Sequence, residues 1–110
     1  MRYTEGLCGS VLRPIVAGGG RSSHHLFPVE ITAGDPGAVL ERLADRGVQI
    51  GRHYPVVCPD QPAAQGLGPV VDDLGVARRI AEREVSLPIN PQLEDAEVDA
   101  VLDACLEVCA

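Results

Sequence analysis

The segment spanning residues 24–54 constrains the fold most, because strand-type and helix-type patterns follow each other within a short distance. Residues 24–31 place apolar or aromatic side chains at alternate positions, namely His25, Phe27, Val29 and Ile31. This two-residue repeat indicates a half-buried strand. Pro28 cannot donate a hydrogen bond to a neighbouring strand, so we expect this strand at an edge of the sheet or at a bulge.

A helix with clear start and stop signals comes next. Asp35 suits the N-cap, Pro36 the first helical position and Gly47 the C-terminal stop. An apolar stripe with helical spacing lies between them, formed by Val39, Leu40 and Leu43. Residues 48–54 then predict a second strand, with Val48 and Ile50 on one face.

The remaining elements complete an α+β pattern. Residues 2–9 suggest a short helix, residues 10–23 a flexible loop, residues 55–69 a Pro/Gly-rich loop, residues 70–84 a helix, residues 86–89 an extended piece and residues 95–109 an amphipathic helix. The order helix–strand–helix–strand–loop–helix–strand–helix predicts a small three-stranded sheet with helices packed mainly on one face. We expect one small domain over residues 1–110, in which residues 24–110 form the α+β part.

Composition narrows the possible partners and the compartment. The net charge is −7, and the aromatic side chains are Tyr3, Phe27 and Tyr54 alone, so a nucleic-acid partner is not expected. No stretch approaches the roughly 20 apolar residues of a membrane span, and the first residues contain no apolar signal region. We therefore predict a cytoplasmic protein with free thiols and no membrane partner.

Several short motifs occur in a fixed order along the chain. They are Leu26–Val29 (LFPV), residues 47–55 (GVQIGRHYP), residues 61–63 (QPA), residues 81–91 (AEREVSLPINP) and the set Glu97, Val98 and Val101. Together they resemble the C-terminal small domain of the DegT/DnrJ/StrS-type sugar aminotransferases, which are pyridoxal-phosphate (PLP) enzymes of the aspartate-aminotransferase fold. The resemblance runs from about Tyr3 to Val108.

The resemblance implies that a larger, cofactor-binding domain is missing from these 110 residues. In the family that domain carries the lysine that binds PLP, and residues 1–9 resemble the end of the helix joining the two domains. The sequence contains no lysine. Because transamination needs a lysine amine to form the aldimine, we expect no aminotransferase activity from this chain alone. PLP would act here only if a separate large-domain chain supplied the lysine.

The loop after residue 51 holds the candidate site. The resemblance places His53 and Tyr54 near a ligand, and Arg52 and Gln61 are further candidates for substrate binding. Family members often have a proline at Val57, a histidine at Pro59 and an acidic residue at Arg78, so this part of the site is altered.

For acid–base chemistry the candidates are His53, Tyr54 and Asp60. Asp60 could orient the His53 imidazole across a turn, or His53 could be a loop residue inherited from the family without a task. Arg52 could hold a carboxylate or phosphate, or pair with a surface acid.

Cysteine and histidine residues admit further interpretations. Cys58 could act as a thiolate nucleophile, although an inert loop residue is the simpler interpretation. Cys105 and Cys109 could bind zinc with His24 or His25, but ordinary core packing is favoured because the spacing is not that of a metal motif. For the two adjacent histidines we expect one ring packed on Phe27 and the other in water.

Three hypotheses for function remain. The first is an accessory or binding subunit in sugar or specialised-metabolite biosynthesis, assembled as a homo-oligomer or with a full-length or large-domain aminotransferase chain. The second is a cofactor-independent enzyme that uses the old substrate pocket for a small-molecule ligand. The third is an excised piece of a complete aminotransferase.

Overall fold

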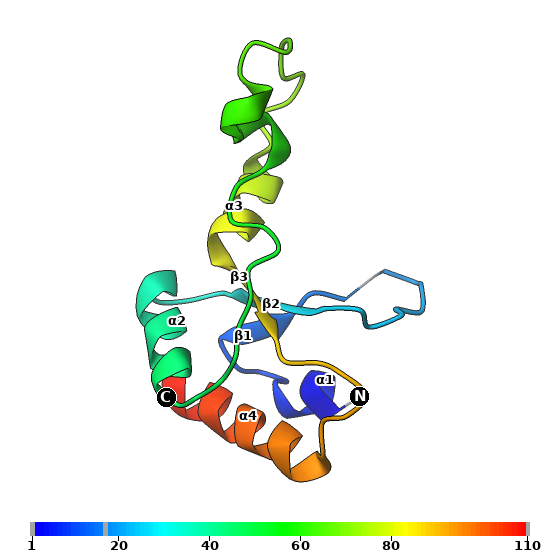
Figure 1. The fold of residues 1–110 in the computed structure, drawn as a ribbon, viewed down its shortest axis with the longest axis vertical. Helices are drawn as coiled ribbons and strands as arrows, with labels where there is room; N and C mark the ends of the chain where they lie inside the picture. Colours follow the sequence, from blue (N-terminus) through cyan, green and yellow to red (C-terminus); the bar gives the residue numbers. More distant parts are fainter. Residues whose placement is uncertain (1, 17, 110) are drawn as a thin grey trace.

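A three-stranded antiparallel sheet forms the centre of the protein, as seen in a computed structural model that describes residues 2–16 and 18–109. The strands are β1 (Leu12–Pro14), β2 (Phe27–Ile31) and β3 (Glu84–Leu87), in the spatial order β1-β2-β3. The helices are α1 (Arg2–Gly6), α2 (Pro36–Asp45), α3 (Gly75–Arg83) and α4 (Asp95–Val108), with 3₁₀ turns η1 (Cys58–Asp60) and η2 (Pro62–Ala64). Figure 1 shows their arrangement.

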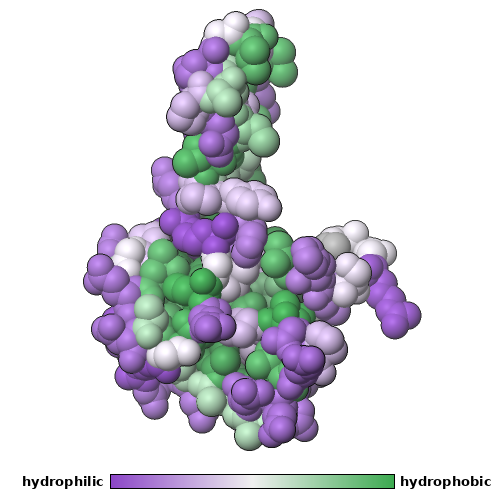
Figure 2. Space-filling view, in the orientation of Figure 1, coloured by the Kyte–Doolittle hydropathy of each residue, from purple (hydrophilic) through white to green (hydrophobic). Residues whose placement is uncertain are grey.

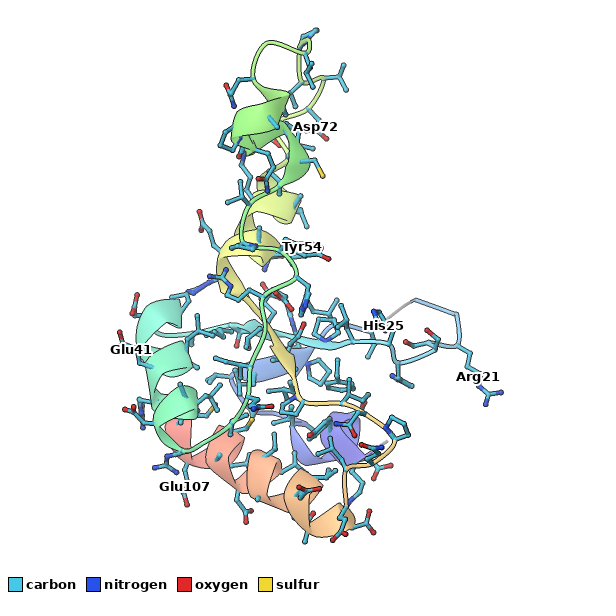
Figure 3. The ribbon with its side chains drawn as sticks, in the orientation of Figure 1. Arg21, His25, Glu41, Tyr54, Asp72 and Glu107 are labelled. Carbon is cyan, nitrogen blue, oxygen red and sulfur yellow. The ribbon has the colours of Figure 1, made fainter. Side chains whose placement is uncertain are left out.

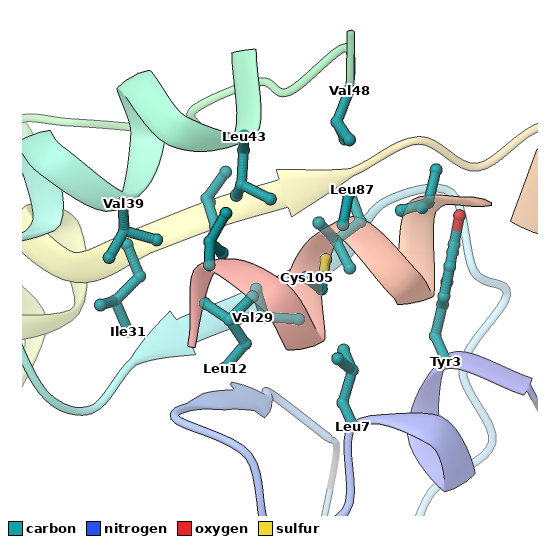
Figure 4. Packing of buried hydrophobic residues seen from close by; sticks show 14 of the residues in the cluster. Tyr3, Leu7, Leu12, Val29, Ile31, Val39, Leu43, Val48, Leu87 and Cys105 are labelled. Carbon is teal, nitrogen blue, oxygen red and sulfur yellow. The ribbon is translucent and has the colours of Figure 1, made fainter. Parts of the chain in front are cut away.

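One face of the sheet is apolar and covered by helices. Cross-strand pairing sets Phe27 opposite Leu87, Val29 opposite Val85 and Leu12 opposite Ile31. The buried sides of α1, α2 and α4 close over this face, with Tyr3, Val39, Leu43 and Cys105 in the same core (Figure 4). The expected α+β class, with helices packed mainly on one face, is therefore confirmed.

The opposite face of the sheet is polar although it is also buried. Glu30 on β2 lies directly opposite Glu84 on β3, and each is only 3% exposed. Arg13 and Arg79 both form ion pairs with Glu30. Two carboxylates at adjacent positions repel each other, so these arginines supply compensating charge for one of the pair.

The helix starts follow the sequence signals. The Asp35 carboxylate accepts a hydrogen bond from the Ala38 amide at 2.8 Å, which caps α2 as predicted. At the start of α4, Glu94 and Glu97 form a reciprocal capping box. Both helices therefore satisfy amide groups that would otherwise have no partner.

The predicted position of β2 was wrong. β2 is the central strand and not an edge strand. Its proline is tolerated because the Pro28 carbonyl accepts the Ile15 amide at 3.0 Å, just beyond the last residue of β1. The nitrogen and carbonyl of one residue point to the same side of a strand, so the missing donor lies where β1 has already ended.

Two further expectations needed correction. Residues 48–54 do not form a strand: in the described structure they contribute one bridge, between Gly51 and Ser86. Val48 is nevertheless buried and Ile50 packs against the core, so the alternation identified the inward-facing residues. Residues 10–23 contain β1, which the loop prediction missed because a three-residue strand has too little pattern to show.

Residues 54–83, which include η1, η2 and α3, project from the rest of the molecule and are called the arm; the other described residues are called the body (Figure 1). The arm accounts for the elongated dimensions of 48 × 31 × 25 Å. Nowhere in the described chain is a helix both long enough and apolar enough for a membrane span.

Candidate functional site

The loop that enters the arm is attached to the edge of β3. The Gly51 amide donates to the Ser86 carbonyl at 3.1 Å, and the Ser86 amide donates to the Gly51 carbonyl at 2.8 Å. This pair of bonds fixes the backbone at residue 51. The next residues are thereby held above the polar face of the sheet.

His53 is bound to that face through two buried side chains. Its backbone amide donates to Glu84 Oε2 at 2.9 Å, and its ring Nδ1 lies 2.9 Å from Ser86 Oγ. The Ser86 hydroxyl in turn donates to Glu84 Oε1 at 2.6 Å. Glu84 is 3% and Ser86 4% exposed, whereas His53 itself is exposed. A continuous chain of polar contacts therefore links a buried carboxylate to an accessible imidazole.

Glycine at position 51 leaves room for the imidazole. A Cβ atom at this position would lie 2.7 Å from His53 Cε1, closer than side chains approach one another in folded proteins. Any other residue at position 51 would displace the His53 imidazole from the position that it occupies here. Gly51 is thus a requirement of the ring position.

A groove of about 510 Å³ lies between this loop and α3. His53, Tyr54, Glu84 and Cys58 contribute to its lining, together with apolar residues of segments 56–59 and 74–81. Tyr54 is 72% exposed, and its ring meets the His53 ring edge-on with centroids 5.4 Å apart. The peptide bond between them is cis. Figure 3 shows Tyr54 pointing outward at the base of the arm.

Asp60 is not the partner of His53. Its carboxylate binds the Arg78 guanidinium through two contacts of 2.8 Å each. The hydrogen bonds from Arg78 hold the pKa of Asp60 below its ordinary value. Glu84 and Ser86 occupy the orienting position that the sequence assigned to Asp60. The sequence predicts a helix that ends at residue 84, whereas β3 begins there, so the two-residue spacing that puts both side chains on one face of a strand was missed.

Arg52 and Gln61 are used within the protein. The Arg52 guanidinium donates to the Ala81 carbonyl, and its Nε is buried with no hydrogen-bond partner among the described residues. Gln61 donates to the Val56 carbonyl at 3.0 Å and so braces the loop. The groove lining includes His53 and Tyr54 but neither of these two residues. The structure thus brings together only part of the predicted binding set.

The cysteines divide between groove and core. Cys58 is exposed at the groove, whereas Cys105 is fully buried. Burial raises the pKa of Cys105 to about 12 and raises that of the half-buried Cys109 as well. The expected core role of Cys105 is confirmed. In residues 2–16 and 18–109, no three His, Cys, Asp or Glu side chains come together as a metal site.

One of the two adjacent histidines packs as expected. The His24 ring stacks on Phe27 with centroids 6.3 Å apart. His25 is exposed, as His24 also is, on the loop that precedes β2 (Figure 3).

Sheet, helical layer and arm together define a small α+β domain of the kind found in PLP-dependent aminotransferases. The crystal structure of Streptomyces venezuelae DesV with a ketimine intermediate superposes with a TM-score of 0.82 at 33% identity, covering 96% of this chain and 29% of that one. The aminotransferase TlmJ from Streptoalloteichus hindustanus gives a TM-score of 0.79 at 28% identity, covering 97% of this chain and 29% of that one.

Residues 3–106 match the DegT/DnrJ/EryC1/StrS aminotransferase family, and the chain belongs to this family. Among its relatives is the dTDP-3-amino-3,4,6-trideoxy-alpha-D-glucose transaminase of Streptomyces venezuelae, 34% identical over 107 residues. The match covers 96% of this chain and 28% of that enzyme. The resemblance to the family is thus confirmed, for a region of about the size expected for its small domain.

Proposed function

We propose that this chain is the small-domain component of a sugar aminotransferase, and that its partner, the cofactor-bearing component, lies outside these 110 residues. The single observation behind this proposal is that a chain of this family, spanning 28% of its relative, contains no lysine. Its ligand would be a sugar carried on a nucleotide, by analogy with the relative's substrate, and its compartment the cytoplasm.

The residues of this chain do not fit covalent attachment of PLP. The Schiff base of such enzymes forms on a lysine amine, and the nine basic residues other than histidine are all arginines. What this chain offers is a groove with a held imidazole and a phenol at its rim.

The arm has the surface expected of a docking element for that partner. Among the residues that the structure describes, most exposed large apolar side chains lie on it, namely Tyr54, Val56, Leu67, Val70, Val71 and Val76. Val71 is 99% and Leu67 82% exposed. Figure 2 shows apolar patches on the arm, at its tip and farther along it, among polar residues. Exposed apolar residues gathered on one projection mark an interaction site.

Co-purification with a cofactor-bearing partner tests the proposal. The chain is co-expressed with the large-domain segment of a family aminotransferase that lacks its own small domain, and the mass of the complex is measured by light scattering. We expect a complex for the unaltered chain and its loss for the double variant Leu67→Asp with Val71→Asp. Val16→Asp, at a residue of the body that is 68% exposed, is the matched control and should still bind.

Absorbance provides the second measurement. PLP added to the chain alone should give no Schiff-base band, and the complex should show one. A band from the chain alone, or no complex at all, would overturn the proposal. A complex of two identical chains, with no uptake of the large-domain segment, would instead identify a homo-oligomer. If the 110 residues are an excised piece, the same surface is covered within one longer chain.

A cofactor-independent enzyme is the second candidate, supported by the imidazole and phenol that border one groove. His53 and Tyr54 would then exchange protons with the ligand. Asp60 forms an ion pair with Arg78, so it is not assigned a role in this proton transfer. Loss of turnover in His53→Ala without PLP present would support it; unchanged turnover would remove it.

A further inference from the structure

The chain of contacts from Glu84 to His53 determines which ring nitrogen carries the proton. Both oxygens of Glu84 accept hydrogen bonds, one from the His53 amide and one from the Ser86 hydroxyl. A carboxylate can only accept hydrogen bonds, so in the 2.6 Å contact the hydrogen comes from the Ser86 hydroxyl. The serine hydroxyl has a single hydrogen, and this hydrogen is directed at Glu84.

It follows that Ser86 Oγ can only accept from the imidazole. The 2.9 Å contact between Nδ1 and Oγ therefore requires a hydrogen on Nδ1. In neutral histidine, one ring nitrogen carries the hydrogen and the other has a free lone pair. The free lone pair here is that of Nε2, on a residue that borders the groove.

We infer that Glu84 and Ser86 are positioning residues, which hold the His53 imidazole as its Nδ1–H tautomer and leave Nε2 as an acceptor for a hydroxyl group of the ligand. The inference rests on the proposed function in one respect, namely that the groove takes a sugar ligand. The tautomer itself depends only on contacts within this chain. Gly51 is part of the same arrangement, because a Cβ there would displace the ring.

The sheet provides a matched control. Glu30 lies directly opposite Glu84 on the same face and is equally buried, at 3% exposure. Its partners are Arg13 and Arg79, and no contact joins it to His53 among the described residues. Replacing Glu30 therefore perturbs the polar face without touching the contacts of the imidazole.

Nitrogen-15 spectra of the histidine side chains test the inference on the intact chain. The protein has three histidines, and His53→Gln assigns the signals of interest. At a pH where His53 is neutral, we expect hydrogen on Nδ1 and a free Nε2. In Ser86→Ala and Glu84→Gln the Nδ1–H fraction should fall several-fold, Ser86→Thr should restore it, and Glu30→Gln should leave it unchanged.

The inference is overturned if the unaltered chain has its hydrogen on Nε2, if Ser86→Ala changes nothing, or if Glu30→Gln has the same effect as Glu84→Gln. Amide spectra report whether each variant is folded. Should Ser86→Ala unfold, Gly51→Ala provides the second test, because it moves the ring while both polar side chains remain. An unchanged Nδ1–H fraction in a folded Gly51→Ala variant contradicts the inference.

The ligand is tested separately. dTDP-glucose is added to the complex of this chain with the cofactor-bearing component, and the Nε2 signal should shift while Nδ1 keeps its hydrogen. A correct tautomer with no ligand-induced shift would leave the positioning role in place and contradict the assignment of the groove to a sugar. The two failures are therefore distinguishable.

Discussion

The body and the arm place apolar residues in opposite environments. In the body, valines and leucines from both halves of the chain are sealed between the sheet and three helices. Among the described residues of the arm, Ala81 is the one that is buried, and valines such as Val71 are exposed to solvent. The same residue types therefore stabilise the fold in one region and remain available for contact in the other.

This difference indicates which region is stabilised by its own packing and which region exposes apolar surface to other molecules. The hydrophobic effect favours removal of apolar surface from water, at roughly 25 cal/mol per Å². The body has already gained this stabilisation by folding. The arm can gain it only by association, so substitutions in the body should change stability and equivalent substitutions in the arm should not.

Thiol reactivity should show the largest difference. Cys105 is fully buried in the body, and Cys58 is exposed on the arm. Modification of Cys105 requires the body to open, and an opening that costs about 3 kcal/mol slows the reaction about a hundredfold. Mass spectrometry after brief treatment with a thiol reagent should find Cys58 modified and Cys105 intact. Equal rates for the two would mean that the body is not a closed core.

Alkaline stability should depend on the same buried thiol. The pKa of Cys105 is about 12 in the fold against an ordinary value of 9.0. The contribution of the buried Cys105 to the free energy of unfolding is fully present below pH 9.0. It is lost as the pH rises from 9.0 toward about 12, because only the unfolded thiol ionises in this range. Urea midpoints measured across it should fall, and less so in Cys105→Val. Cys58→Val should follow the unaltered chain.

A matched pair of valine substitutions tests packing directly. Val85→Ala removes two buried carbon atoms from a side chain that is 0% exposed, whereas Val71→Ala acts at one that is 99% exposed. We expect a loss of about 2 kcal/mol in the free energy of unfolding for the first and less than about 0.5 kcal/mol for the second. Urea denaturation measures both. A large effect at Val71 would show that the arm is packed in solution.

Replacing the residue that caps a helix should separate the body from the arm by a smaller difference in stability than the valine pair does. Asp35 caps α2 in the body, and Asp35→Ala should lower the free energy of unfolding by about 1 kcal/mol. In the arm the Asp73 carboxylate accepts the Gly75 amide at 3.0 Å at the start of α3. Asp73→Ala should loosen α3 alone, visible as faster amide exchange there with an unchanged urea midpoint. A shifted midpoint would couple the arm to the body.

The smallest effect concerns the surface pair Asp60–Arg78. Hydrogen bonds from Arg78 lower the pKa of Asp60, so the pair is present above the ordinary carboxyl range and is lost as the pH falls through the lowered value. Arg78→Ala should return the pKa of Asp60 toward its ordinary value in an NMR titration. The urea midpoint should stay unchanged, since exposed ion pairs contribute little.

The sequence predicted the elements that carry dense local signals. Helices α2 and α4 were found from their caps and apolar stripes, and β2 from its alternation. β1 was missed because three residues make no period, and it is a strand only because β2 lies beside it. The central place of β2 was missed because Pro28 is tolerated through the early end of β1, which is a property of the partner strand.

The site was predicted in outline and not in its contacts. The motif pointed to His53 and Tyr54, and both border the groove. Chain proximity suggested Asp60 as the orienting residue, yet the partners come from β3, about 30 residues further along. Glu84 and Ser86 lie within a motif of the family, which says nothing of their contacts, and a buried carboxylate opposite another one is not evident until the strand register is known.

The bridge between Gly51 and Ser86 has a consequence for how this protein can associate. Exposed strand edges allow other chains to add to a sheet by backbone pairing. The outer edge of β3 is already paired at its middle with Gly51, and β1 is three residues long with a charged Arg13 and ends in Pro14. Neither edge is a template for strand addition or fibril growth. Association is thus left to side chains, and the arm is where they are exposed.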